Sequence, residues 1–292
     1  MPFPHIAYGT PRKLPKAKNL PGRVVVLDVA FASKAGGASF EKTTLPFIEG
    51  LGNRLAMWID HHDHERHADY ADDPRFVLHT KAEHGACPEI VTPELVARAG
   101  RVDTICCHVD FDGLCSAAKW IRGGEEPYPG ADADAHAIDT RLGTPSDRAM
   151  VMDRALRGNP RDDAMKGMMI RYLAEGATDL AMLREFKDAA QELLAKENEA
   201  KRLATRYEIR GKVAVCDARI REGFYDKTHL LLLGQEIAPI SLVHDESTVT
   251  VAARFDSGID LLSILGLEGG MPTRVSVAAK KLGEVLDALD AR

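Results

Sequence analysis

The chain has 292 residues, a length that favours two domains over one small core. Apolar residues make up 45% and charged residues 28% of it, which excludes a disordered or collagen-like chain. The formal net charge of −6 argues against a protein that coats long nucleic acid, but it allows a small nucleotide at a local site.

Targeting and redox signals favour a cytoplasmic protein. No apolar run approaches the ~20 residues that cross a bilayer, and the first residues carry no secretory signal. The five cysteines form no CxxC pair and no disulfide framework, so we expect a reducing compartment.

The first half of the chain predicts an α/β domain. Residues 1–22 contain five prolines and predict an arm that wraps over a neighbour or stays loose. From Arg23 onward, short apolar runs alternate with helical stretches. Four of these runs predict buried parallel strands: RVVVLD, LAMWIDHH, VDTICCHVDFDG and ADAHAID.

The second half predicts a long helix and a smaller domain. TDLAMLREFKDAAQELLAKENEAKRLATRYEI contains no Pro or Gly, and its apolar stripe comprises Leu180, Leu183, Phe186, Ala190 and Leu194. After Gly211, short strands are predicted at KVAVCDA, HLLLLGQ, APISLVHD and TVTVAARF, and a last helix from about Val277 to Leu289. We therefore predict an α/β parallel-sheet domain with helices on both faces over residues 1–177, a linker helix over 178–209 and an α+β domain over 210–292.

Each predicted strand of the first domain ends at a carboxylate, an imidazole or both. The residues are Asp28; Asp60, His61 and His62; His108, Asp110 and Asp112; and Asp139. Because the carboxyl ends of parallel strands share one edge of an open sheet, we expect these side chains to meet there. Crowded carboxylates repel one another unless cations neutralise them or some stay protonated. Carboxylates mixed with imidazoles suit Mn²⁺, Zn²⁺ or Fe²⁺, and the set is large enough for two ions that activate a water for phosphoryl displacement.

Each motif taken alone has an ordinary explanation. A single Asp at a strand end is commonly a helix N-cap, and His64 and His67 are interpreted as surface histidines. The period-two rule, however, puts His108, Asp110 and Asp112 on one side of an extended strand end. The joint occurrence of DHH and HxDxDG favours a metal site, and we interpret Cys106, Cys107 and Cys115 as buried packing residues.

With these residues the sequence resembles the DHH phosphoesterase superfamily. The resemblance is carried by WIDHH, HVDFDG, VVVLD and HAIDTRLG, and HVDFDG stands after DHH here whereas it comes first in the family. The second domain resembles the DHH-associated domain: TVTVAARFDSG is similar to its Arg-bearing strand and GLEGGMPTRVSVAA to its GGGH-type loop. Met271 stands where that loop commonly has a histidine.

The resemblance implies a site with two divalent ions, with Mn²⁺ expected. The implied metal ligands are Asp28 as the bridge, His108 and Asp110 at one ion, and His61, Asp112 and Asp139 at the other. His62 would contact the substrate phosphate and Asp60 would orient the ligand histidines, so these two form the implied catalytic pair. In the second domain the implied substrate-binding residues are Arg254, Arg274, Gly269 and Gly270.

The resemblance also implies a phosphoric ester hydrolase. The expected activity is that of a phosphodiesterase or phosphatase on short oligonucleotides, linear dinucleotides or phosphoadenosine phosphate. A RecJ-like single-strand exonuclease and a non-catalytic nucleotide-binding regulatory protein stay open as alternatives. The aromatic content of 6% argues against a path for long single strands. The expected partner is a small phosphate ester, not long nucleic acid or a membrane, and a homodimer is left open.

Overall fold

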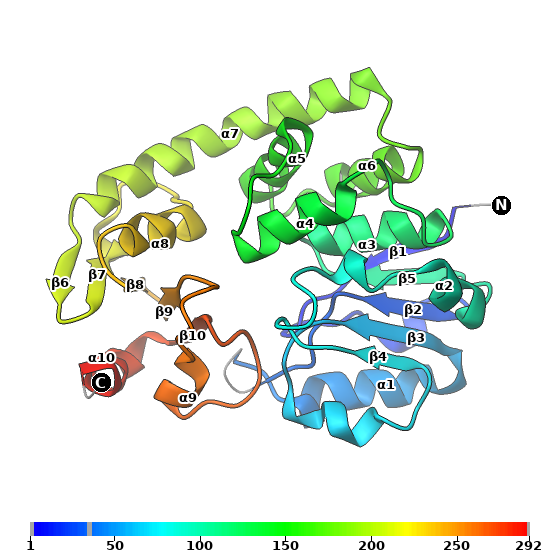
Figure 1. The fold of residues 1–292 in the computed structure, drawn as a ribbon, viewed down its shortest axis with the longest axis horizontal. Coiled ribbons are helices and arrows are strands. Elements are labelled where there is room, and N and C mark those ends of the chain that lie inside the picture. The colour runs from blue at the N-terminus through cyan, green and yellow to red at the C-terminus, as the bar shows by residue number, and fades with distance from the viewer. Residues whose placement is uncertain (1–2, 34–36, 291–292) are drawn as a thin grey trace. The chain divides into compact units, whose positions relative to one another are not determined.

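The computed structural model describes residues 3–33 and 37–290. The chain divides into two compact units, which comprise residues 1–32 with 38–190 and residues 33–37 with 191–292. Each unit is built around a five-stranded sheet (Figure 1).

The sheet of the first unit is entirely parallel, with the order β1-β5-β2-β3-β4. Its strands are β1 (His5–Tyr8), β2 (Val24–Leu27), β3 (Leu55–Asp60), β4 (Phe76–Leu78) and β5 (Thr104–Cys107). Every residue of β2, β3 and β5 is buried, as expected of strands that are covered on both faces. The predicted fold class, a parallel α/β sheet, is therefore confirmed.

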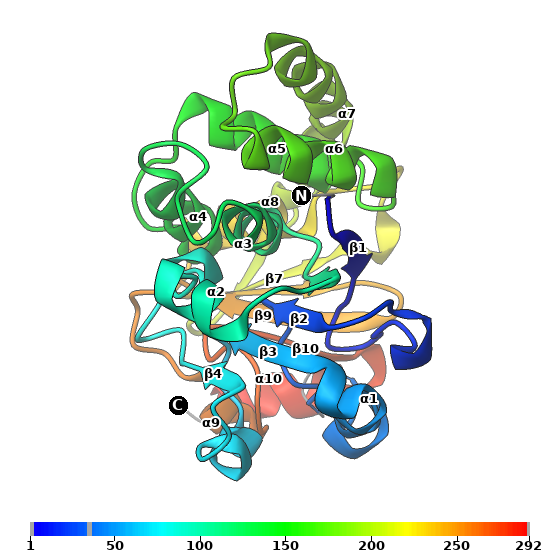
Figure 2. The ribbon, with the colours of Figure 1, turned by 90° about the vertical axis from the view of Figure 1, so that its right-hand side faces the viewer.

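Helices cover both faces of this sheet (Figures 1 and 2). One face carries α2 (Pro93–Ala99), α3 (Phe111–Ile121), α4 (Ala131–Thr140), α5 (Asp147–Gly158) and α6 (Asp163–Ala174). These helices share a core with Val25, Leu27 and Ile105 of the strands. The alternate strand residues, including Val24, Val26 and Trp58, pack on the other face with α1 (Leu45–Leu51). Alternate side chains of each strand thus pack into two separate hydrophobic cores, one on each face of the sheet.

The predicted strand ADAHAID is wrong, because this segment is the helix α4. Its alternation of alanine with polar residues has the period of a strand. Alanine, however, has the strongest intrinsic helix preference, and Gly130 starts the helix from a left-handed conformation. Asp139 consequently reaches the site from the last turn of a helix, not from a strand end.

The predicted proline-rich arm over residues 1–22 is also wrong for the part that the structure describes. His5–Tyr8 forms the edge strand β1, which pairs in parallel with Thr104–Cys107 of β5. Residues 1 and 2 lie outside the described residues. A strand of four residues is too short for its alternating pattern to be recognised in a segment that contains five prolines.

The second unit has a mixed sheet with the order β10-β9-β8-β7-β6. Its strands are β6 (Glu208–Arg210), β7 (Val213–Asp217), β8 (Ile240–His244), β9 (Thr248–Ala253) and β10 (Arg274–Ala278), and only the β7–β8 pair among them is parallel. α8 (Lys227–Gln235) and the end of α7 (Leu180–Ala204) pack on one face. α9 (Leu261–Leu265) and α10 (Leu282–Asp290) pack on the other.

Three predictions for this half need correction. HLLLLGQ is not a strand but part of α8, whose N-cap residue Asp226 accepts the backbone N–H of His229 with its side chain. The last helix begins at Leu282, because Arg274–Ala278 is taken up by β10. The long helix α7 is present, but Leu180 and Leu194 of the predicted stripe are 75% and 51% exposed. Phe186 of the stripe is fully buried, and the other fully buried positions of that helix, Leu193, Ala200 and Leu203, lie outside the predicted stripe.

Across the described residues, none of the helices has both the length and the apolar character that a membrane span requires.

Candidate metal centre

Three neighbouring strands deliver the predicted ligands of the first unit. β5, β2 and β3 are adjacent in the sheet, and their carboxyl ends lead to His108, Asp28 and Asp60 with His61 and His62. Backbone bonds align these ends, since Asp28 N donates to Ile59 O at 2.9 Å and His108 N to Leu27 O at 3.2 Å. The edge predicted from the strand pattern is therefore where these side chains lie.

His61 lies at the middle of the cluster. Its Nε2 atom is 3.2 Å from Asp28 Oδ1, 3.5 Å from Asp112 Oδ2 and 4.0 Å from Asp139 Oδ2. Its Nδ1 atom donates to the carbonyl oxygen of His84 at 2.9 Å. A carbonyl can only accept, so this bond places the ring proton on Nδ1 and leaves the Nε2 lone pair facing the carboxylates.

The other two histidines each lie against a carboxylate. His108 Nδ1 is 2.7 Å from Asp110 Oδ2 and 3.7 Å from Asp28 Oδ2. His62 Nδ1 is 2.8 Å from Asp60 Oδ1, and the His62 side chain remains 20% exposed. Asp110 precedes α3 at the N-cap position, yet its side chain makes no capping hydrogen bond, so the carboxylate stays free for the cluster.

Three triads of side chains in this cluster have the spacing of a metal site. The triads are Asp28, His61 and His62; Asp28, His108 and Asp110; and His61, Asp112 and Asp139. Within each triad the ligand atoms lie within 4.8 Å of one another. The structure thus brings together every residue that the sequence predicted for the first domain.

Several polar atoms of the cluster are buried without a hydrogen-bond partner among the described residues. They are both carboxylate oxygens of Asp28, Nε2 of His61 and Oδ1 of Asp110. Buried polar atoms of native proteins almost always have a partner, and the binding of an ion is one of the recognised explanations for those that have none within the protein. The donor set of carboxylate oxygens and imidazole nitrogens fits divalent ions such as Mn²⁺ or Zn²⁺.

Two carboxyl groups of the cluster resist ionisation. Burial raises the pKa of Asp28 well above its ordinary value, and neighbouring Asp112 and Asp110 raise it further. Burial likewise raises the pKa of Asp112, followed by the charges of Asp110 and Asp139. Cations in the cluster would favour the ionised form of both groups.

Other groups keep their charge state through a specific neighbour. Burial alone would raise the pKa of Asp60, but hydrogen-bonded His62 outweighs it and brings that pKa to about 2. Burial would also raise the pKa of Asp110 and of Asp139. His108 nevertheless lowers the pKa of Asp110, and Lys81 lowers the pKa of Asp139. Burial and nearby Lys81 lower the pKa of His61 to about 3, so this imidazole is neutral at physiological pH.

Asp28 has an unusual backbone conformation, with φ of +58°. Non-glycine residues rarely adopt this left-handed conformation, which costs of order 1 kcal/mol and concentrates at functional sites. It turns the chain sharply out of β2 where the Asp28 carboxylate enters the cluster.

Two contributors were missed from the sequence. The Lys81 ammonium forms an ion pair with Asp139, and the His84 carbonyl fixes the ring of His61. Both lie in the loop after β4, where a lone lysine and a backbone oxygen give no sequence signal. The DHH motif is visible in the sequence, but the loop residues that contact its imidazole rings can be identified only in the three-dimensional structure.

The structure contradicts the interpretation of two further histidines and agrees with that of three cysteines. The surface interpretation of His64 and His67 is wrong, because both rings pack edge-on against Phe31, with ring centroids 5.6 and 5.2 Å from it. The His64 side chain is only 2% exposed. The packing role of Cys106, Cys107 and Cys115 fits the structure, where these thiols are free and buried.

The predicted substrate-binding residues of the second domain lie in the other compact unit. Arg254 is exposed and holds Asp256 through two bonds, Nε to Oδ1 at 3.1 Å and Nη2 to Oδ2 at 2.9 Å. Arg274 Nη1 donates to Thr228 Oγ1 at 3.2 Å. Gly269 and Gly270 have φ of +69° and +114°, conformations that favour glycine.

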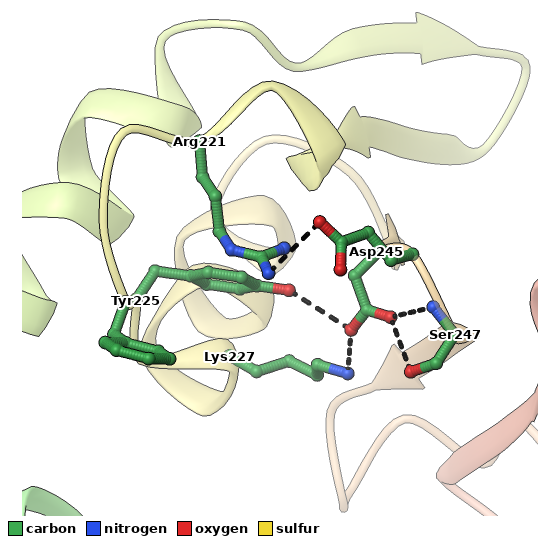
Figure 3. A pocket seen from close by; sticks show the side chains of 7 residues that line it. Arg221, Tyr225, Lys227, Asp245 and Ser247 are labelled. Atoms are coloured by element: carbon green, nitrogen blue, oxygen red, sulfur yellow. Dashed lines mark hydrogen bonds and ion pairs between the residues drawn. The ribbon is translucent and has the colours of Figure 1, made fainter.

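A cavity of about 190 Å³ also lies in the second unit (Figure 3). Its lining combines charged side chains with Phe224, which is 82% exposed, and Tyr225. The charges are paired: Arg221 lies 3.4 Å from Glu246, and the Asp245 carboxylate accepts from Lys227 and the backbone of Ser247. No motif in the sequence predicted this cavity.

Comparison with known proteins yields a distant neighbour. No protein-family model matches the chain, and no curated protein matches it significantly. Among solved structures, a pGpG-specific phosphodiesterase, PggH from Vibrio cholerae, is similar at 15% identity with a TM-score of 0.37. The similarity covers 53% of this chain and 64% of that one, so the chain matches less than two thirds of PggH. A likeness of this size carries no information on the substrate of this chain.

Proposed function

We propose that the chain is a metal-dependent phosphodiesterase or phosphatase that acts on short nucleotides. One observation carries this proposal. Six candidate metal ligands meet at the carboxyl edge of a parallel sheet, and several of their buried polar atoms have no hydrogen-bond partner among the described residues. When bound at such a site, divalent ions supply a nucleophilic water and offset the negative charge of a phosphoryl group. We keep two ions, with Mn²⁺ as the expected metal, as part of the proposal.

The residues of the chain would divide the work. Asp28 lies in two of the three triads and is the candidate bridge, while His108 with Asp110 and His61 with Asp112 and Asp139 complete the two sides. His62 is the candidate phosphate contact. Its Nδ1 is held by Asp60, its side chain is partly exposed, and its Nε2 is left to meet a phosphate oxygen. Asp60 is then a positioning residue.

Recognition of the nucleotide is assigned to the second unit within the same proposal. Arg254 offers a planar guanidinium suited to a phosphate, and it would exchange Asp256 for the substrate. Gly269 and Gly270, with their positive φ angles, would present backbone N–H groups to an anion, and Arg274 is a second candidate.

Product analysis with the Mn²⁺-loaded chain tests the proposal. The panel comprises bis-p-nitrophenyl phosphate, RNA and DNA oligomers of increasing length, linear dinucleotides, phosphoadenosine phosphate and pyrophosphate. We expect hydrolysis of the shortest nucleotides, its loss in Asp112→Asn and its retention in Asp72→Asn, a change of an exposed carboxylate. Preference for long single strands would instead indicate an exonuclease. Binding of nucleotides by the metal-loaded wild type without hydrolysis of any compound would indicate a nucleotide-binding protein and overturn the proposal.

A further inference from the structure

A buried lysine is part of the carboxylate cluster. The side chain of Lys81 is only 3% exposed, and its ammonium is paired with the Asp139 carboxylate. Lysine is almost never fully buried without a partner. Asp139 belongs to the triad with His61 and Asp112, so the lysine holds a carboxylate that a divalent ion would need.

The loop that carries Lys81 is fixed at both ends to the DHH segment. At its start, His79 N donates to Asp60 O at 2.9 Å. At its end, the His84 carbonyl accepts the Nδ1 hydrogen of His61 at 2.9 Å. Lys81 is therefore held against the cluster by the same residues that form it.

Bonds within the loop add to this rigidity. The Glu83 carboxylate accepts both the backbone N–H and the hydroxyl of Thr80, at 2.8 and 2.9 Å. The backbone N–H of His84 donates to Thr80 O at 3.0 Å. The turn over residues 80–84 thus places the ammonium before any ligand arrives.

The two sides of the cluster differ in their relation to this cation. Lys81 is ion-paired with Asp139, on the side of His61 and Asp112. In the part of the chain that the structure describes, no such pair joins Lys81 to Asp28 or Asp110 of the other side. An ion that binds beside Asp139 must therefore compete with the ammonium for one oxygen and bear its repulsion at short range.

We propose that Lys81 is a built-in cation that makes the two metal positions unequal. The triad of Asp28, His108 and Asp110 fills first, and the triad of His61, Asp112 and Asp139 fills only at a higher metal concentration. This inference rests on the metal centre of the proposed function. It adds to that function a residue that sets how many ions the resting protein holds.

Titration of the metal-free protein with Mn²⁺ tests the inference without any measurement of hydrolysis. Calorimetry and equilibrium dialysis with elemental analysis give the number of bound ions and the affinity of each. For the wild type we expect one tight ion and a second that binds at least about tenfold more weakly. In Lys81→Met, which keeps an unbranched apolar side chain but removes the ammonium group, the second affinity rises about tenfold or more while the first changes little.

Two further variants serve as controls. Lys81→Arg keeps the positive charge and should keep the weak second position. Lys166→Met removes another buried lysine of the same unit, which is 4% exposed and paired with the exposed Asp163 instead of the cluster. It should titrate like the wild type.

The outcomes separate this inference from the proposed function. Two ions of equal affinity in the wild type overturn the role of Lys81 and leave the metal centre intact, even when Lys81→Met does not fold. An unchanged second affinity in folded Lys81→Met also overturns it. A wild type that binds no Mn²⁺ removes the metal centre, and the proposed function and the inference then fail together.

Discussion

Gly113 leaves open the space that the Asp28 carboxylate occupies. A β-carbon at Gly113 would lie 3.0 Å from Asp28 Oδ2, 2.8 Å from the His108 carbonyl oxygen and 2.9 Å from His108 Cβ. Contacts this short with backbone cannot be relieved by a side-chain rotation. The glycine of HVDFDG is therefore required by close packing of α3 against the ends of β2 and β5.

Gly113→Ala is expected to loosen the metal centre. The added methyl group must displace Asp28 or His108, which should lower the free energy of unfolding by about 1–3 kcal/mol and weaken Mn²⁺ binding. Urea unfolding and metal titration measure the two effects. Gly167→Ala is the matched control in α6, since its β-carbon would meet only Tyr8 Oη at 3.8 Å. Equal behaviour of the two variants would contradict the packing argument.

Asp60→Asn is expected to slow hydrolysis without removing metal. The substitution preserves the volume of a fully buried side chain but removes the charge that holds His62 Nδ1 at 2.8 Å. Loss of such an orienting carboxylate typically costs about 10- to 100-fold. Steady-state kinetics beside elemental analysis separate the two readouts. Loss of bound metal would instead identify Asp60 as a ligand, and unchanged kinetics would show that His62 needs no such support.

The sequence predicted which side chains of the first unit lie close together better than it predicted the elements that carry them. Asp28, His61 and His108 follow strands whose continuous apolar runs are unambiguous, and the carboxyl edge of a parallel sheet then determines that they meet. Asp139 lies beside His61 and Asp112 although its segment is a helix, because the position of a side chain in space does not depend on the type of element that carries it. Its alternating pattern has the period of a strand, which alanine preference overrides.

What could not be predicted depends on tertiary contacts. Lys81 is a single charged residue in a loop, and only the fold brings it to Asp139. His64 and His67 lie in a charged, polar segment that is typical of an exposed surface, yet both rings pack against Phe31. Leu180 and Leu194 satisfy a helical stripe in the sequence, but the helix passes from one unit to the next and buries different positions.

Arg254→Ala is expected to raise KM for a short nucleotide by roughly tenfold or more, since bonds to charged groups are worth about 1.5–3 kcal/mol. Metal content should not change. Arg219 offers a matched control, because it also holds an exposed carboxylate two residues away, Asp217, through two bonds of 2.8 and 2.6 Å. Arg219→Ala should leave KM unchanged. A similar rise in both variants would show a general charge effect, and metal loss in Arg254→Ala would contradict its assignment to the substrate.

Metal affinity is expected to fall as the pH is lowered, at a higher pH than an ordinary aspartate would cause. The raised pKa values of Asp28 and Asp112 mean that these groups tend to hold protons in the metal-free protein, and divalent ions must displace them. Below those pKa values the affinity should drop about tenfold per pH unit for each proton displaced. His61 adds no proton competition in this range, because its pKa is lowered to about 3. His108 adds to the competition, because Asp110 raises its pKa against the opposing effect of burial. Calorimetry from about pH 7.5 to about pH 5.5, in buffers of different ionisation enthalpy, measures both affinity and proton release. Asp28→Asn should release fewer protons than the wild type, whereas an affinity that is flat over this range and independent of buffer would show that both carboxyl groups are already ionised before the metal binds.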